Sequence, residues 1–170
     1  MSNTNSRRAR ARSVLLGLAF ALTLLLSAAG ARAAVWKGLE PFVSKRADVE
    51  RALGVPVADR FAEDGTLEFN VSGGKVTVFF VTPKFVATKR LPPQYEGTVL
   101  QIVLQHDSAT DTPESMNIVK NSAFKRTAKG DVEFYMNEKE GIGYTFVGSH
   151  LKTTRYAYSE QQLARMQRGK

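Results

Sequence analysis

The sequence has 170 residues, no cysteine, 43% hydrophobic and 24% charged residues, and a formal net charge of +8. This is the composition of one globular domain, and it excludes collagen-like, coiled-coil and disordered chains. The absence of cysteine excludes disulfide scaffolds, thiolate nucleophiles, iron–sulfur clusters and cysteine-ligated zinc, since each of them needs sulfur.

The first 33 residues have the order of a secretory signal peptide. An arginine-rich run comes first, then an uncharged run of leucines and alanines, then small residues, reading RRARAR, VLLGLAFALTLLL and SAAGARAA. As a helix the uncharged run would span about 20 Å at ~1.5 Å per residue, less than the ~30 Å hydrocarbon core of a membrane. Residues 31 and 33 fit an A-x-A cleavage site, so we expect Sec-type export and cleavage before Ala34. The mature chain would then work in the periplasm or outside the cell, without a stable transmembrane anchor.

The basic excess belongs mostly to this leader. It contains five of the 24 lysines and arginines and none of the 16 acids, which leaves 19 bases against 16 acids and a net charge of +3 on the rest of the chain. A nucleic-acid partner inferred from the whole-chain charge would rest on a segment that we expect to be removed. We therefore expect no nucleic-acid partner.

The mature chain opens with a short predicted helix over 45–53. Ser44 is a favourable N-cap residue, and Gly54 followed by Pro56 ends the helical pattern. A helix of this length does not persist alone, so it must pack against another element.

Strands are predicted where apolar and polar residues alternate between turn residues. These segments are 67–71, 75–81, 98–105, 131–137, 142–147 and 151–158. The pair Gly73-Gly74 is expected to supply the first hairpin turn, and Gly141 lies near the second. Residues 107–113 predict a polar break.

The remaining segments predict helices and a loop. A short helix is expected over 114–121, and a basic loop over 122–130. Ser159 and Gln162 form a capping-box pattern that opens a final helix through Arg168.

Together these elements predict an α+β fold, an antiparallel sheet built from two hairpin-plus-strand halves with short helices packed on it. Residues 34–170 would form a single domain, in which the segments 44–106 and 114–158 are the halves of a pseudo-repeat. A chain near ~150 residues buries about 68–70% of its unfolded surface, so we expect no cofactor or metal to be needed for stability.

Two stretches carry a family resemblance. The segment 44–56, SKRADVERALGVP, resembles the STRADVExxLGxP motif of an uncharacterised family of bacterial exported proteins, with Lys45 where that family usually has Thr. The stretches YMNEKEGIGYTF and LKTTRYAYS resemble the same family's later hairpin and closing strand. More distantly, the helix motif and hairpin are similar to the SmpA/OmlA (BamE-like) outer-membrane assembly domain and to small periplasmic inhibitor-like folds, although the chain lacks the lipid-bearing cysteine. By analogy, the resemblance implies an envelope-associated or protein-binding module.

One segment brings an imidazole and carboxylates close together in sequence. His106, Asp107 and Asp111 are the candidates for a metal site or for an acid–base hydrolase. Adjacent strand residues point to opposite faces, so His106 and Asp107 could share an ion only if the strand ends there.

Two other groups are candidates for binding. Tyr156 and Tyr158 are expected on one strand face, where they could form an aromatic platform or part of the core. Lys125 and Arg126 belong to a basic cluster that could meet an anionic surface or remain a solvated loop.

No catalytic constellation stands out from these residues. The leading hypothesis is an exported non-enzymatic module that binds an envelope or secreted protein. Two alternatives stay open, a hydrolase centred on His106 and a small-molecule or lipid carrier with an apolar cavity between helix and sheet.

Overall fold

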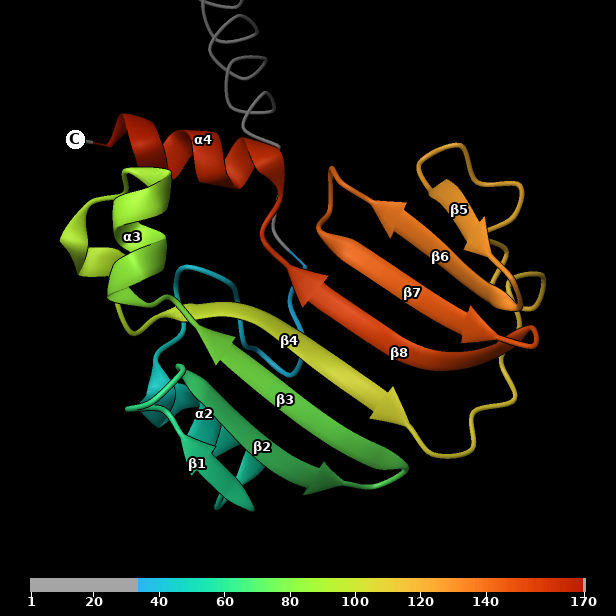
Figure 1. The fold of residues 1–170 in the computed structure, drawn as a ribbon, viewed down its shortest axis with the longest axis horizontal. Coiled ribbons are helices and arrows are strands. Elements are labelled where there is room, and N and C mark those ends of the chain that lie inside the picture. The colour runs from blue at the N-terminus through green and yellow to red at the C-terminus, as the bar shows by residue number, and fades with distance from the viewer. Residues whose placement is uncertain (1–33, 170) are drawn as a thin grey trace, which may run out of the picture. The chain divides into compact units, whose positions relative to one another are not determined.

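The computed structural model describes residues 34–169, which belong to one compact unit with its own core. The predicted signal peptide, residues 1–33, lies outside the described residues. The described chain forms one eight-stranded antiparallel sheet with helices packed against it, so the predicted α+β fold is confirmed (Figure 1). No helix in this part of the chain has the length and apolar character needed to cross a membrane.

The sheet runs in the order β1-β2-β3-β4-β8-β7-β6-β5. Its strands are β1 (Ala58–Arg60), β2 (Thr66–Val71), β3 (Gly74–Phe80), β4 (Val99–His106), β5 (Lys125–Lys129), β6 (Val132–Asn137), β7 (Ile142–Val147) and β8 (His150–Ala157). The helices are α2 (Arg46–Leu53), α3 (Pro83–Lys89) and α4 (Glu160–Arg168), with the short 3-10 helix η1 (Pro93–Tyr95) between α3 and β4.

Two four-stranded meanders make up this sheet. Strands β1 to β4 pair in chain order, β5 to β8 do the same, and β4 joins the two sets by pairing antiparallel with β8. The strand order thus repeats between the halves. A helix, α2, opens only the first half, so the predicted pseudo-repeat of 44–106 and 114–158 stays a prediction.

One face of the sheet, called the covered face below, carries the core. Val49 of α2 is fully buried against β2, β3 and β4, whose alternate side chains Phe69, Val76 and Ile102 are also buried. In the second half the turns of 107–124 take the place of a helix and pack against a cluster that includes Phe146. Every second side chain of these strands is therefore buried, as is usual in an antiparallel sheet with a core on one face.

A third cluster lies where the strand ends meet α3, η1 and α4. Phe42 is at its centre, with its ring 5.1 Å from that of Tyr158 and 5.9 Å from that of Tyr95. Gln162 of α4 is buried, and its side-chain Nε2 donates a hydrogen bond of 2.8 Å to the carbonyl of Pro41. These contacts hold α4 and the end of β8 against the turn at residues 41–43.

Several local predictions are confirmed. Two hairpins form where the alternating patterns placed them, β2–β3 and β6–β7. The Ser159 hydroxyl caps α4 by accepting from the backbone N–H of Gln162, at 3.1 Å. The polar segment 107–113 lies between strands, as expected.

Other local predictions are wrong. The N-cap of α2 is Lys45, because the Ser44 hydroxyl accepts from the backbone of Glu40. Residues 114–121 form turns instead of a helix, and the predicted basic loop 122–130 contains strand β5. Helix α3 was not predicted, although Thr82 caps it and proline occupies its first turn, a recognised start signal.

Two glycines hold equivalent positions in the two halves. Gly74 opens β3 and Gly141 precedes β7, each at positive φ, and a Cβ on either would overlap a backbone carbonyl oxygen of β4 or β8, at Gln105 or Ala157. A backbone oxygen held in a sheet cannot move aside as the tip of a flexible side chain can. Both positions therefore require glycine for space as well as for conformation.

Replacing either glycine by alanine should destabilise the fold by about 3 kcal/mol or more, combining the strain of positive φ with overpacking. Gly130→Ala is the matched control, because Gly130 also has positive φ but a Cβ there meets no atom within 4 Å. Urea unfolding of residues 34–170 measures the loss of stability for all three variants. An equal decrease in the free energy of unfolding for Gly74→Ala, Gly141→Ala and Gly130→Ala would contradict this account.

Candidate functional site

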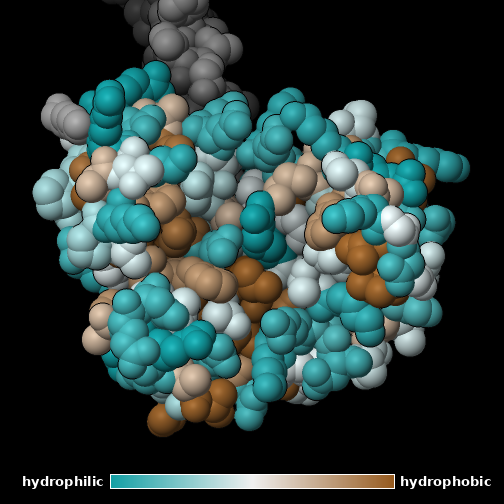
Figure 2. Space-filling view, viewed as in Figure 1, coloured by the Kyte–Doolittle hydropathy of each residue, from teal (hydrophilic) through white to brown (hydrophobic). Residues whose placement is uncertain are grey.

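The sheet's other face, called the open face below, is turned away from the core clusters of Val49 and Phe146 and toward the viewer in Figure 1. Side chains from five strands lie in register across its middle, in the order Thr77, Val103, Arg155, Gly143 and Met136. Figure 2 shows that apolar side chains gather on this face with hydrophilic ones between them. The open face is therefore mixed in character, and no helix or strand among residues 34–169 covers it.

A small hollow, called the Gly143 hollow below, lies in this row. Its volume is about 200 Å³, and it is lined by Val103, Phe134, Tyr135, Met136, Gly143, Tyr144, Thr145, Thr153 and Arg155. It exists because Gly143 has no side chain in the middle of β7. A Cβ at Gly143 would come within 2.9 Å of the terminal methyl of Met136, which now leans over that position. The backbone of Gly143 lies outside the positive-φ region, so the strand itself does not require glycine here.

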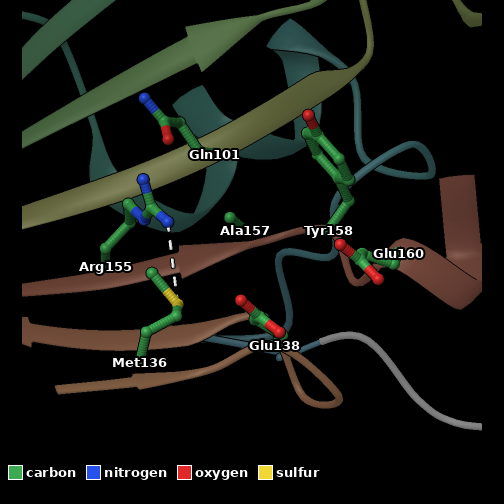
Figure 3. A pocket seen from close by; sticks show the side chains of 8 residues that line it. Gln101, Met136, Glu138, Arg155, Ala157, Tyr158 and Glu160 are labelled. Carbon is green, nitrogen blue, oxygen red and sulfur yellow. Dashed lines mark hydrogen bonds between the residues drawn. The ribbon is translucent and has the colours of Figure 1, made fainter. Parts of the chain in front are cut away.

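A second hollow, called the end hollow below, adjoins the first toward the start of α4. Its volume is about 370 Å³, and it is lined by Gln101, Met136, Glu138, Gly141, Arg155, Ala157, Tyr158 and Glu160. Met136 and Arg155 line both hollows, and Figure 3 shows their side chains meeting. The two hollows are therefore neighbours that share Met136 and Arg155 as lining residues, and together they are called the depression below.

Arg155 differs from the other arginines that face neighbouring strands. Its guanidinium Nη2 donates to the sulfur of Met136, at 3.7 Å, and it makes no ion pair within residues 34–169. Arg60, by contrast, pairs with two acids, and Arg126 pairs with Glu133. A sulfur is a weak acceptor, so most of the hydrogen-bonding capacity of Arg155 remains for a bound group.

The two acids of the end hollow have a cation of their own. Glu138 pairs with Lys125 of β5, with 2.6 Å between Oε2 and Nζ. The pKa of Lys125 is raised, chiefly by this hydrogen bond, with a smaller contribution from the charge of Glu160. The negative charge of this hollow is thus concentrated beside Lys125, and Arg155 is the one charged side chain that lines the Gly143 hollow.

The structure places the two candidate tyrosines in different surroundings. Tyr156 points to the covered face, where its ring stacks on Trp36 at 6.4 Å and burial raises the pKa of its hydroxyl. Tyr158 follows the end of β8, packs on Phe42 and lines the end hollow. Both rings pack against core clusters, which is the alternative in which these tyrosines belong to the core and not to an aromatic platform.

The two candidate basic residues are neighbours on β5 and point to opposite faces. Lys125 pairs with Glu138, as described above. Arg126 donates to Glu133 at 3.0 Å, and the pKa of Glu133 is lowered first by this bond and then by one from Tyr135. Both side chains are exposed and already neutralised by acids on β6 or just beyond it. Of the four candidate binding residues, Tyr158 alone lines a hollow.

The His106 segment does not assemble a metal site. His106 lies at the end of β4, with Nε2 2.9 Å from the hydroxyl oxygen of Thr154. Within residues 34–169 no three histidine, aspartate or glutamate side chains are grouped closely enough to hold a metal ion, so Asp107 and Asp111 do not complete a site with His106.

The space between α2 and the sheet holds side chains where a carrier would need a cavity. Val49, Leu67, Phe69, Val76 and Val78 fill it, each at most 1% exposed. The hollows described above lie on the opposite face, and they are open and shallow instead of deep and apolar.

Comparison with known proteins gave no match to any family model, curated protein or solved structure.

Sequence analysis did not identify three of the residues that shape the depression. Arg155, Met136 and Gly143 come from three strands, and no motif links them. The available signal was the alternation in β8, which puts Arg155 on the face opposite Tyr156.

His106 yields a prediction about pH. Burial lowers the pKa of its imidazole below the ordinary value of 6.5, and the charge of Asp111 opposes this only in part. The folded state thus binds fewer protons than the unfolded state, so its stability is complete above the unfolded pKa and falls as the pH drops through the lower folded pKa.

Unfolding free energies measured between about pH 7.5 and 5 should therefore fall less steeply for His106→Gln than for the wild type. His150→Gln, which removes the second histidine at an exposed position, serves as the control. Identical slopes for the wild type and His106→Gln would show that another group sets the acid sensitivity.

Proposed function

We propose that the mature chain is an exported, non-enzymatic module that binds an envelope or secreted protein through the open face of its sheet. The observation that supports this most directly is the pair of neighbouring hollows around Arg155, which no element of residues 34–169 covers. Partner-binding surfaces combine an apolar centre with polar groups that fix orientation, and this depression has both.

The signal-peptide pattern of residues 1–33 and the resemblance to exported bacterial families support the compartment in this proposal. Both were read from the sequence alone, and both lead to the same class of partner. We accordingly place the protein's work in the periplasm or outside the cell, and its partner among the proteins found there.

Chemistry at this surface is a weaker alternative than binding. The depression contains Arg155 and two acids near Lys125, but no histidine and no hydroxyl held by a base. A nucleophile or general base needs a partner within hydrogen-bonding reach, which these lining residues do not supply. Recognition needs only shape and charge, and both are present.

Affinity capture with blocked variants tests the proposal. Immobilised mature chain is exposed to the envelope and secreted fractions of its native cell, beside Gly143→Val and Lys75→Gln. The valine fills the Gly143 hollow, and its β-branched side chain suits a strand, so the variant should unfold at the same or a higher urea concentration than the wild type. We expect at least one protein to be recovered by the wild type and at least tenfold less by Gly143→Val.

Lys75→Gln is the matched control, because Lys75 is an exposed cation on the open face that lines neither hollow. It should recover the same protein as the wild type. Recovery that is equal in all three chains, or the absence of any captured protein, would refute binding through this face.

A further inference from the structure

We infer that the Gly143 hollow recognises the C-terminal residue of a partner chain, an apolar side chain together with its own terminal carboxylate, with Arg155 as the anchor. This inference rests on the proposed function and adds the chemistry of the partner. It depends on the charge, the apolar lining and the size of the hollow.

The one charged residue that lines the hollow is Arg155, a cation that makes no ion pair within residues 34–169. Its guanidinium donates to the weak acceptor sulfur of Met136. Arg155 also lines the end hollow beside Glu138 and Glu160, but Glu138 is paired with Lys125 and neither acid forms an ion pair with Arg155. A guanidinium with unused donors in a fixed fork is the group that best receives a carboxylate, through two parallel hydrogen bonds.

The rest of the lining is suited to an apolar group. Val103, Phe134 and Met136 present apolar side chains to the space, and Phe134 is 45% exposed although it is a large aromatic residue. The hydroxyls of Thr145 and Thr153 lie 2.9 Å apart and bond to each other, so the hollow offers few other polar contacts. A ligand that fits must bring both an apolar group and an anion.

The size of the hollow limits how the apolar group and the anion of the ligand can be joined. A volume of about 200 Å³ accommodates one side chain, and Arg155 lines that same space. In an extended segment, successive side chains point to opposite sides, so an acidic residue next to the apolar one would point away from the sheet. A terminal carboxylate lies on the backbone of the apolar residue itself, within reach of Arg155.

A titration with small probes tests the inference without the unknown partner. N-acetyl-L-phenylalanine carries an aromatic side chain and a carboxylate on one residue. N-acetyl-L-phenylalaninamide lacks the charge. N-acetyl-L-glutamyl-L-phenylalaninamide places the acid on the preceding residue with the terminus blocked. Each is added to isotopically labelled mature chain, and backbone amide and Met136 methyl signals are followed by NMR.

We expect N-acetyl-L-phenylalanine to shift signals of Gly143, Met136 and Arg155 and to bind about tenfold more tightly than either blocked probe. Arg155→Gln should remove this preference, while Lys75→Gln, with the same charge change on the same face, should retain it. Gly143→Val should abolish the shifts. Unfolding curves check that each variant is folded.

Several results would overturn the inference. These are equal binding of the acid and the amide, tighter binding of the glutamyl probe, and shifts confined to another surface. If the probes fail in this way while Gly143→Val still loses the captured protein, the partner chemistry is wrong and the proposed function stands. If Gly143→Val captures as well as the wild type, the proposed function itself is wrong, whatever the probes do.

Discussion

The antiparallel pairing of β4 with β8 at the centre of the sheet is the interaction on which the rest of the structure depends. It is the strand pairing that joins the two meanders. On the covered face it sets Ile102 beside Tyr156, which connects the first core cluster to the second half of the chain. On the open face the same register sets Val103 beside Arg155, and so makes the wall between the two hollows. One set of backbone hydrogen bonds therefore fixes both the core and the candidate site.

Much of this fold could be predicted from the sequence, because its hairpins carry strong local signals. Alternation and glycine turns identify β2–β3 and β6–β7 directly, and Ser159 marks the start of α4. Strand β5 was missed because KRTAK has no apolar alternation and all five of its residues are exposed. Its strand conformation comes from pairing with β6, and its charged side chains suit an edge strand that must not attract other chains. The prediction of a helix over 114–121 was wrong as well. These residues form turns, and packing of Ile118 against the second cluster holds them in place.

The candidate site was harder to predict, because it depends on register between strands far apart in the chain. Val103 and Arg155 are neighbours only through the β4–β8 pairing, and a shift of one residue would turn Arg155 to the covered face. Aromatic and basic residues stood out in the sequence, yet Tyr156 stacks on Trp36, and Arg126 is neutralised by Glu133. Residue type alone does not distinguish a side chain that packs or pairs internally from one that remains available. The distinction depends on the partner of each side chain, Trp36 for Tyr156 and Glu133 for Arg126. Only the structure shows these partners.

Gly143 shows how the two faces of the sheet obey different requirements. The covered face needs volume, and its strands supply Phe, Val, Leu and Ile there. A glycine in mid-strand weakens a sheet, by up to about 1 kcal/mol relative to a β-branched residue, and Gly143 gains nothing from its backbone conformation in return. What it provides is the absence of a side chain between Arg155 and Met136. Because the open face takes no part in the core, the fold tolerates this loss, and the face proposed for binding is distinct from the face that holds the protein together.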